Sequence, residues 1–574
     1  MAKVVVDPVT RIEGHLGITM ETKDVTTSTG TWTLVDKAYS HSNMFRGFEI
    51  ILKGRDPRDA YFLTQRICGV CHAVHGAASM QALDHAYGVT PPPAAVLIRN
   101  VLHACFYCYD HMIHTYLLVG PELGILAKYP PMVPPALGKE GIAKLGLGSS
   151  YAKCVEMQRI ANEATALWGG RAPFPVAEYP GGVTVKLTLD RIAGTVGRMN
   201  QVWNFAVHTM YNDLMALVEK NEHIGEAVST LLDVDFRGLQ DVGPSYPTQL
   251  SYGLFPDPDN YDDWVKAQDG EPSRRKSAVI HAGAWNGDFK AFELGKIKEY
   301  VKYSKYSDEC TGLHPKEGKT IPQKDKPGAY AWAKAPRYED KPYEVGPFAR
   351  MVNTFGLRWK FDVTNPISGE TFTFDWKVLN PNSSVIDRVA GRVAQTILFA
   401  TKAMEWAIEL KQWVHDATAT INPKTNNFSY VPDAAEGIGL WDAPRGALLH
   451  YTKIRGGKIE NYQCVVPSTW NLGPRDDMGQ PGPVEKALEN TWLPQIDVPT
   501  IANTLYPEAD IDASAFGLGK VKWGDALAVA LKPLGLAPIN MENGYNTSLA
   551  LAIVRSFDPC LACAVHEIDL NIRR

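Results

Sequence analysis

Apolar residues recur every three or four positions over long stretches of the chain, and this period predicts helices. The stretches cover residues 57–88, 94–119, 150–168, 188–230 and 382–416. The first 40 residues differ, because VVVD, HLGITMET and TWTLVDKAY are β-rich and are separated by turn residues. The pattern therefore predicts a mainly α fold, in which a central bundle of long helices is joined by a small N-terminal antiparallel sheet.

Two regions interrupt the helical period. Residues 255–350 are rich in Pro, Gly, Lys and Tyr with short strand-like pieces between them, and residues 420–540 form a second region of this kind. We interpret both as irregular α+β excursions on the surface rather than as separate domains. We find no internal repeat and no low-complexity tract. One large domain over 1–574 is expected, with a β-rich segment at 1–43 and a helical core at 44–230 and 382–416.

Composition narrows the class of protein. The 574 residues carry a net charge of −5, which gives no electrostatic case for binding nucleic acid. A chain of this length can bury a sizeable, dry core. The start MAKVVVDPVTRIEG lacks a long apolar stretch behind basic residues, so we expect no signal peptide. No segment offers about 20 apolar residues, so we expect a soluble chain that a partner carries or anchors.

Cysteine placement points to metal chemistry. Nine cysteines are too few for a disulfide scaffold in this chain, but six of them form C-x-x-C pairs: Cys68/Cys71, Cys105/Cys108 and Cys560/Cys563. In RICGVCHAVH, two thiolates three residues apart can both reach one metal. His75 follows Cys71 by four residues, so it would lie on the same side of a helix and could donate a hydrogen bond to a ligand thiolate.

The last pair lies in DPCLACAVH, behind the helical stretch NTSLALAIVRSF. We expect Asp558 to cap a helix and Pro559 to take its first position, which places Cys560 in the first turn. The backbone N–H groups there would favour a thiolate with a lowered pKa. The two outer pairs together offer four thiolates. Zinc suits such a set, but zinc ribbons close a loop of about 15–20 residues, whereas these pairs lie at opposite ends of the chain. Nickel and iron also suit soft thiolates.

The middle pair invites a further metal role, because Asp110, His111 and His114 lie close to it in sequence. We interpret Cys105 and Cys108 instead as core cysteines on one helix face, and Cys154 and Cys310 in the same way.

RICGVCHAVH and DPCLACAVH resemble the two signature motifs of nickel–iron hydrogenase large subunits. Five further blocks resemble that family in the same order: VVVDPVTRIEGHL at 4–16, MFRGFEIILKGRDPRDA at 44–60, APRYEDKPYEVGPFARM at 335–351, DAPRGALLHY at 442–451 and NYQCVVPSTWNLGPRD at 461–476. The resemblance implies an enzyme, of the membrane-associated uptake type, that reversibly cleaves H2 heterolytically at a nickel–iron centre whose iron carries carbon monoxide and cyanide.

The resemblance also implies a role for each matching residue. Cys68 and Cys560 would be terminal nickel ligands, and Cys71 and Cys563 would bridge nickel to iron. Cys560 would take the proton from H2, and Glu13 would relay it outward. The C-terminal metal-binding segment would then cover 550–566.

Other matching residues would surround the metals. Arg445 would place its guanidinium over their open side, and Ser468 would contact cyanide. Magnesium would be bound by Glu49, the backbone carbonyl of Cys464 and His566. Asp558 and Glu122 would belong to a canopy of charged groups near the open site, although a solvated position at a helix end suits Glu122 equally.

Two electrons must leave this centre, and the chain has no further cysteine group with ferredoxin-like spacing. An iron–sulfur small subunit is therefore expected as partner, in a heterodimer or a larger oligomer, together with maturation factors and a membrane cytochrome reached through the small subunit. Such a complex would lie in the periplasm or on the outer face of the membrane, co-exported with the small subunit, or alternatively in the cytoplasm. Phe174 stands where many relatives have a His near the clusters, which leaves the subgroup open. The tail EIDLNIRR at 567–574 is either removed after metal insertion or retained.

Three other functions share some of these features. A hydrogen-sensing subunit would keep the same ligands. The quinone-site subunit of respiratory complex I shares the fold but lacks the paired cysteines. A zinc-stapled structural protein would contain zinc in place of nickel and iron.

Overall fold

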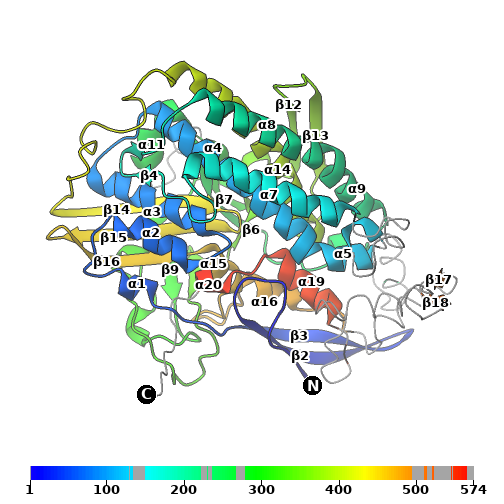
Figure 1. Cartoon of the computed structure of the whole chain (residues 1–574). Helices are drawn as coiled ribbons and strands as arrows, with labels where there is room; N and C mark the ends of the chain where they lie inside the picture. Colours follow the sequence, from blue (N-terminus) through cyan, green and yellow to red (C-terminus); the bar gives the residue numbers. More distant parts are fainter. Residues whose placement is uncertain are drawn as a thin grey trace.

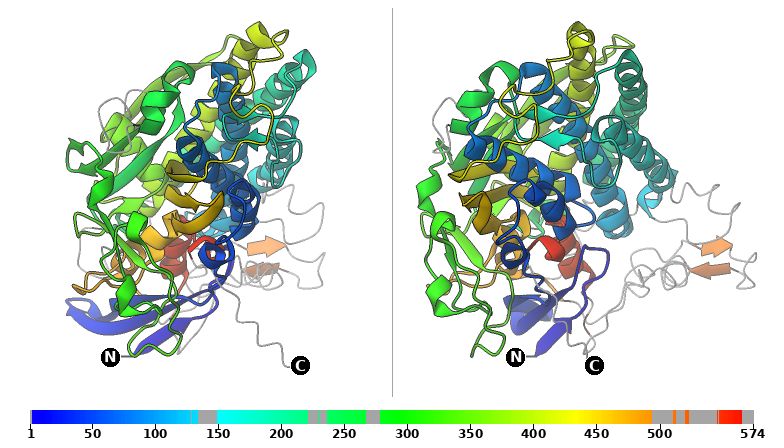
Figure 2. Two further views of the ribbon diagram at one scale, coloured as in Figure 1. Left: turned by 90° about the vertical axis from the view of Figure 1, so that its left-hand side faces the viewer. Right: turned by 60° about the vertical axis from the view of Figure 1, so that its left-hand side comes forward.

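Most of the long helices lie together on one side of the molecule, and most of the sheets lie on the other (Figures 1 and 2). The computed structural model describes residues 2–127, 129–133, 149–220, 229, 236–266, 278–493, 510–512, 520–522, 545 and 547–564. The long helices are α3 (His72–Tyr87), α4 (Pro93–Ile113), α7 (Ser149–Gly169), α8 (Leu189–Phe205) and α14 (Val385–Glu409). They match the predicted helical stretches, and α4 and α14 are buried along most of their length.

Two stretches that the helical period predicts as single helices are each divided in the structure. The stretch 57–88 is α2 (Asp59–Thr64), a 3₁₀ turn (Gln65–Ile67) and α3, with a break at 68–71 that holds the first cysteine pair. The stretch 188–230 is α8, a π turn (Ala206–Met210) and α9 (Tyr211–Lys220), and most of its remainder lies outside the described residues.

The predicted N-terminal sheet is present. Strands β1 (Lys3–Val6), β2 (Leu16–Thr27) and β3 (Gly30–Ser42) pair antiparallel in that order. Helix α16 (Pro483–Leu488) lies against β3, where the Glu485 carboxylate accepts a hydrogen bond of 2.9 Å from the Ser40 N–H. The segment that follows Glu13 is thereby fixed to the body of the molecule.

The prediction of a mainly α fold is too narrow, because buried sheets make the described part of the chain mixed α/β. Strands β14 (Ala434–Ala443), β15 (Gly446–Arg455) and β16 (Lys458–Val465) form an antiparallel sheet inside the region predicted as a surface excursion. Most of β14 and β15 is buried on both faces. A strand covered on both faces loses the alternation of apolar and polar residues, so its pattern did not distinguish it from irregular structure.

A second sheet has the order β11–β6–β7–β8, formed by Glu344–Val345, Thr248–Pro256, Ala278–Asn286 and Phe289–Lys290. Two-stranded sheets are formed by β4 (Glu178–Tyr179) with β5 (Gly182–Val183), β9 (Ile297–Tyr300) with β10 (Ala335–Tyr338), β12 (Arg358–Thr364) with β13 (Thr371–Lys377), and β17 (Asp510–Asp512) with β18 (Lys520–Lys522). The shorter helices include α1 (Phe48–Ile51), α5 (Gly120–Leu126), α11 (Tyr261–Lys266), α13 (Pro347–Phe355), α15 (Pro467–Leu472), α19 (Ser548–Ser556) and α20 (Leu561–Ala564).

Helix α3 packs directly onto β14 because glycines remove the side chains between them. A Cβ atom on Gly439 would lie 1.9 Å from the carbonyl oxygen of Ala78, and one on Gly437 would lie 2.0 Å from that of Ala82. Both distances are far below van der Waals contact, so only glycine permits this approach. The start of α3, which carries His75, is thereby held against the sheet.

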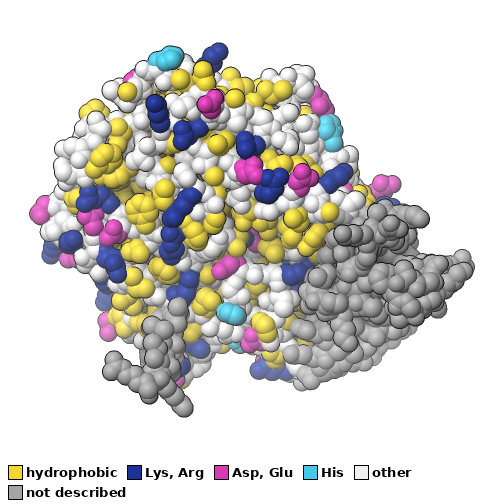
Figure 3. Space-filling view, viewed as in Figure 1, with side chains coloured by type: hydrophobic (Ala, Val, Ile, Leu, Met, Phe, Trp, Pro, Cys, Tyr) yellow, Lys and Arg dark blue, Asp and Glu magenta, His cyan; other side chains and the backbone are white. Residues whose placement is uncertain are grey.

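Hydrophobic side chains gather on the face that carries α1, α2 and α7, with Lys, Arg, Asp and Glu interspersed (Figure 3). The exposed large apolar residues of these elements are Ile50, Ile51, Phe62 and Val155. None of the helices in the described ranges is both long and apolar enough to span a membrane.

Candidate metal centre

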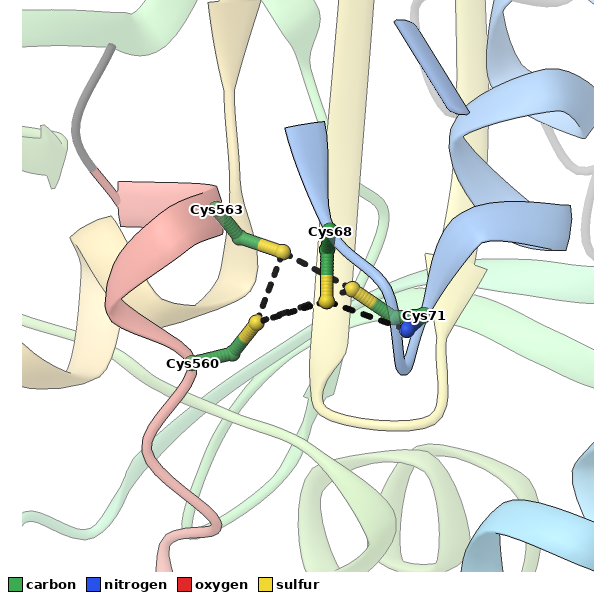
Figure 4. A group of neighbouring side chains, drawn as sticks. All are labelled: Cys68, Cys71, Cys560 and Cys563. Atoms are coloured by element: carbon green, nitrogen blue, oxygen red, sulfur yellow. Dashed lines mark hydrogen bonds between the residues drawn. The ribbon is translucent and has the colours of Figure 1, made fainter. Parts of the chain in front are cut away.

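Four cysteine thiols from the two ends of the chain meet in the interior (Figure 4). The Sγ atoms of Cys68, Cys71, Cys560 and Cys563 all lie within 4.8 Å of one another, and each residue is at most 3% exposed. The Sγ–Sγ distance is 3.2 Å from Cys68 to Cys560 and 2.8 Å from Cys71 to Cys563. No disulfide joins them. We call this group the four-cysteine cluster.

The first pair occupies the break between α2 and α3. Cys68 is extended after the 3₁₀ turn, and Cys71 lies directly before α3. The backbone N–H groups of Val70 and Cys71 donate to the Cys68 Sγ at 3.2 and 3.1 Å. The loop thus wraps around one sulfur, which stabilises negative charge on it.

The second pair is placed by contacts with the N-terminal segment. Glu13 and Cys560 form a parallel β-bridge, and the Cys560 N–H donates to the Ser468 Oγ at 3.0 Å. The Glu13 carboxylate accepts a hydrogen bond of 2.9 Å from the Ala562 N–H, and its backbone carbonyl accepts one from the Leu561 N–H. Glu13 therefore satisfies the free N–H groups at the start of α20.

Glu13 also contacts the cluster itself. Its Oε2 atom lies 3.2 Å from the Cys560 Sγ. Burial raises the pKa of Glu13 to about 7, and the nearby Cys68 thiolate adds to the rise. A carboxyl group with a pKa near neutrality can both accept and release a proton, as the predicted relay requires.

The prediction that Asp558 caps a helix is wrong. Asp558 has a left-handed backbone with φ of 55°, and its carboxylate oxygens lie 2.9 Å from Arg445 and 2.9 Å from Arg392. The helix start is capped by Glu13, which frees Asp558 for these two ion pairs. Arg445 also pairs with Asp110 at 3.1 Å.

Asp110, Arg445, Arg392 and Asp558 form a buried group of alternating charge beside the cluster, which we call the buried quartet. Burial raises the pKa of Asp110 to about 6, although Arg445 opposes the rise. Burial works against the charge of Arg445, but Asp110 and Asp558 outweigh it and hold its pKa well above the ordinary value. Sequence reasoning named Asp110 only as a neighbour of the middle cysteine pair and did not name Arg392. The signal that could have found them is that each is a charged residue within a long helix that is buried along most of its length.

The thiols differ from the expected pattern. We predicted a lowered pKa at Cys560, but burial and the neighbouring thiols raise the pKa of Cys560 well above the ordinary value. Cys68 instead has a pKa held well below that value, because hydrogen bonds from the other thiols outweigh the effect of burial. The two backbone N–H groups that donate to the Cys68 Sγ favour the charged form of the same thiol.

The remaining predicted site residues lie around this group. The His75 Nε2 atom lies 3.2 Å from the Cys563 Sγ, as expected for a hydrogen bond to a ligand thiolate. The Glu49 carboxylate accepts a hydrogen bond of 2.8 Å from the Cys464 N–H. The Lys334 ammonium is 2.9 Å from the Glu299 carboxylate, and Glu49 also raises its pKa. His566 lies outside the described residues, as does the tail 567–574.

Glu122 lies apart from the buried quartet. Its carboxylate forms ion pairs with Arg11 and Arg555, not with Arg445. Phe174 packs over the Arg66 guanidinium, which is 4.0 Å from the ring centroid. The other cysteines of the chain are outside the cluster, and the Cys108 thiol, for example, faces the Thr396 carbonyl at 3.7 Å.

Comparison with known proteins gives consistent matches. The family described as nickel-dependent hydrogenase matches residues 46–122 and 135–503, and one described as HoxL-like matches residues 3–25. The periplasmic NiFeSe hydrogenase large subunit of Desulfomicrobium baculatum is 33% identical over 99% of this chain and 95% of its own length. The hydrogenase-1 large chain of Escherichia coli K12 and the uptake hydrogenase large subunit of Rhodobacter capsulatus are each 30% identical with the same coverage.

Solved structures agree with these sequences. The Ni-Fe-Se hydrogenase from D. vulgaris Hildenborough in the reduced state has a TM-score of 0.71 and 32% identity, covering 98% of this chain and 100% of its own. The name of that enzyme includes selenium, whereas the cluster described above contains only cysteines.

Proposed function

The chain belongs to the nickel-dependent hydrogenase family as a large subunit, and from that membership we propose that the four-cysteine cluster holds its nickel–iron centre. The observation that carries the proposal is the convergence of four buried, unbridged thiols from opposite ends of the chain. Soft thiolates suit nickel and iron.

The donor set fits such a centre in charge as well as in type. Thiolates bind metal in the deprotonated form, so a site for them needs positive charge and N–H donors nearby. Here Arg445 lies beside the thiols, two backbone N–H groups point at Cys68, and His75 lies beside Cys563. When bound, the metals would supply the redox chemistry of H2 cleavage, with Cys68 and Cys560 as nickel ligands and Cys71 and Cys563 shared with iron.

Side chains of the protein would accept the proton from H2 and carry it away. We propose that the Cys560 sulfur takes the proton and that Glu13 carries it away. The contact of 3.2 Å between the Cys560 Sγ and the Glu13 carboxylate supports this step. Because Glu13 is fixed by hydrogen bonds with α20 on both its main chain and its side chain, it stays aligned with that sulfur.

Arg445 would cover the open side of the metals. Its two ion pairs, with Asp110 and Asp558, hold the guanidinium in one orientation and leave little freedom for it to turn. We propose that this fixed charge polarises bound H2 and orients a cyanide on the iron. Ser468, which already accepts from the Cys560 N–H, would contact a second diatomic ligand with its hydroxyl hydrogen.

We propose a magnesium site beside the four-cysteine cluster. Glu49 is buried beside Cys464, and an oxygen-rich site of this kind suits a hard cation. A cation there would be bound by Glu49 and the Cys464 carbonyl, with His566 as the third ligand, while the nearby Lys334 ammonium is paired with Glu299.

Relatives named as large subunits imply a small subunit that carries iron–sulfur clusters. We propose that it docks on the face formed by α1 and α2, where Ile50, Ile51 and Phe62 are exposed. Helix α2 continues through the 3₁₀ turn directly to Cys68, so a partner on this face would lie close to the metals. Maturation factors and a membrane cytochrome would be further partners.

A location in the periplasm, reached together with the small subunit, is our proposal for the assembled enzyme. The Desulfomicrobium baculatum relative is named as periplasmic. Others are named as uptake or quinone-reactive hydrogenases, which favours turnover over hydrogen sensing.

Infrared spectroscopy and metal analysis of the purified heterodimer test the proposal together. We expect nickel, iron in excess of nickel because the clusters of the small subunit add to it, no zinc, and infrared bands from iron-bound carbon monoxide and cyanide. Zinc in the cluster would support the structural staple instead, and metal-loaded protein without these bands would exclude the proposed centre.

A further inference from the structure

A chain of hydrogen bonds leads from the four-cysteine cluster into the sheet β14–β15–β16. It starts at the Cys563 Sγ, which lies 3.2 Å from the Nε2 atom of His75 on α3. The Nδ1 atom of His75 lies 3.1 Å from the Nε2 atom of His450 on β15, and the Nδ1 atom of His450 lies 2.8 Å from the Tyr462 hydroxyl on β16. All four side chains are at most 2% exposed.

The Cys563 thiolate, at one end of this series of hydrogen bonds, fixes which atom donates in each of them. A thiolate that binds metal only accepts, so the Nε2 atom of His75 must carry a hydrogen. The Nδ1 atom of neutral His75 is then an acceptor, and the Nε2 atom of His450 must donate to it. By the same step the Nδ1 atom of His450 accepts, and the Tyr462 hydroxyl donates.

We propose that His450 and Tyr462 are positioning residues that fix the tautomer of His75, so that its Nε2–H donates to the bridging thiolate of Cys563. The proposal rests on the proposed function, because it takes Cys563 as a metal ligand. The role of each residue follows from its position in this series of hydrogen bonds. Tyr462 affects the Cys563 sulfur only through His450, and His450 affects it only through His75.

The surroundings support one fixed arrangement. Helix α3 cannot move away from or along the sheet easily, since Gly439 brings the backbone of β14 against the Ala78 carbonyl. His450 and Tyr462 belong to adjacent paired strands, so their separation is set by the sheet. Burial raises the pKa of Tyr462 well above its ordinary value, so the phenol keeps its hydrogen.

The expected consequence is electronic. A hydrogen bond to a ligand sulfur withdraws charge from it, and donors in a buried chain strengthen one another. Removing the phenol hydroxyl would leave the Nδ1 atom of His450 without its donor and would weaken the N–H···S bond at the far end. More charge would then remain on the sulfur and on the iron it binds.

The test is the Tyr462→Phe variant of the complete heterodimer, with infrared spectroscopy of the iron-bound carbon monoxide. We expect unchanged nickel and iron content and a shift of this band to lower frequency. Tyr451→Phe is the matched control. Tyr451 is a buried phenol that directly follows His450 on β15, so the Tyr451 side chain points to the face of the sheet opposite to that of His450. It should leave the band in place.

A band at the wild-type frequency in metal-loaded Tyr462→Phe would overturn the proposal, and so would an equal shift in Tyr451→Phe. Wild-type protein without any such band would instead refute the proposed function. Neutron diffraction of the wild-type heterodimer gives a second measurement that does not depend on variants. Deuterium on the Nε2 atoms of both His75 and His450 is expected, and deuterium on the Nδ1 atom of His75 would overturn the inference.

Discussion

Glu13 combines a structural role with a chemical one. Its backbone and carboxylate both accept hydrogen bonds from the start of α20, while the same carboxylate contacts the Cys560 Sγ. A glutamine can keep the acceptor for the Ala562 N–H but cannot take up or release a proton near neutral pH. The two roles can therefore be separated by one substitution.

We predict that Glu13→Gln keeps nickel and iron but slows proton exchange. A positioned acid–base group contributes about 10²–10⁴-fold, so H/D exchange between H2 and solvent should fall by roughly that factor. Metal content and infrared bands should match those of the wild type. Glu21→Gln, on β2, is the control and should exchange normally. Wild-type exchange in a metal-loaded Glu13→Gln enzyme would refute the relay.

For single residues, the sequence predicts the site residues that lie within short motifs. It does not predict those that are far apart in the sequence and come into contact only in the folded protein. The spacing within each cysteine pair, and the His75 that follows, indicated a metal site before any fold was known. Asp110 and Arg392 lie on two different helices, and nothing in their local sequence shows that both approach Asp558 or Arg445. The cap assigned to Asp558 was wrong because a distant residue, Glu13, takes that place.

Helices were more predictable than the sheet on which the site rests. The long helices were identified because an apolar pattern sustained over 16 to 25 residues is too long for most strands. The strands β14 and β15 are covered on both sides, so their apolar runs carried no alternation to mark them. The close packing of α3 on β14 depends on Gly437 and Gly439, and no local pattern predicts which helix will approach a pair of glycines.

This packing predicts a large effect of one methyl group. In Gly439→Ala the new Cβ would lie 1.9 Å from the Ala78 carbonyl oxygen, so α3 must shift. We expect a loss of about 1–3 kcal/mol in the free energy of unfolding, together with a lower nickel content, because α3 begins directly after Cys71. Denaturant unfolding and metal analysis measure both effects.

The control for this variant is Gly197→Ala on α8, where a Cβ would meet no atom within 4 Å. Alanine favours an exposed helix over glycine by up to about 1 kcal/mol, so this variant should be as stable as the wild type or more stable. Equal stability of the two variants would show that α3 is free to move off the sheet.

The contact between α16 and β3 predicts a dependence of stability on pH. Burial raises the pKa of Glu485 from its ordinary value of 4.5 to about 7, although Ser40 and Tyr330 donate hydrogen bonds to it. Between these two values the folded protein keeps a proton that the unfolded chain releases, so this group makes the wild type less stable as pH rises. The size is roughly 3 kcal/mol for a shift of this order.

We therefore expect Glu485→Gln to gain in Tm relative to the wild type when the pH is raised from 5 to 8. Thermal unfolding of both proteins at the two values measures the difference. Glu293→Gln, at an exposed position, should show no such change. A constant difference between Glu485→Gln and the wild type would mean that the carboxyl is already charged at pH 5.

At the scale of the whole molecule, the site joins the two ends of the chain. Glu13 and Cys68 come from the first part, and Cys560 and Cys563 from the last, so the centre forms only when the chain has folded as a unit. We propose on this ground that the chain works as one domain. The convergence also explains why the sequence left zinc open: separation along the chain says nothing about distance in the folded protein.

The proposed docking of the small subunit on the α1–α2 face predicts that a charged residue introduced there weakens the complex. If the small subunit docks there, Phe62→Glu would place a charged side chain in an apolar contact, and losing the burial of the phenyl ring alone costs about 1.5–3 kcal/mol. That corresponds to a roughly 10–100-fold weaker complex, which co-purification with a tagged small subunit measures. Ile367→Glu, at an exposed position in the β12–β13 hairpin, is the matched control and should not weaken the complex.

Because Phe62 precedes Cys68 by less than two helical turns, metal content must be measured in the same samples. Full metal content with a weakened complex would assign the face to the partner, whereas unchanged co-purification of Phe62→Glu would place the interface elsewhere.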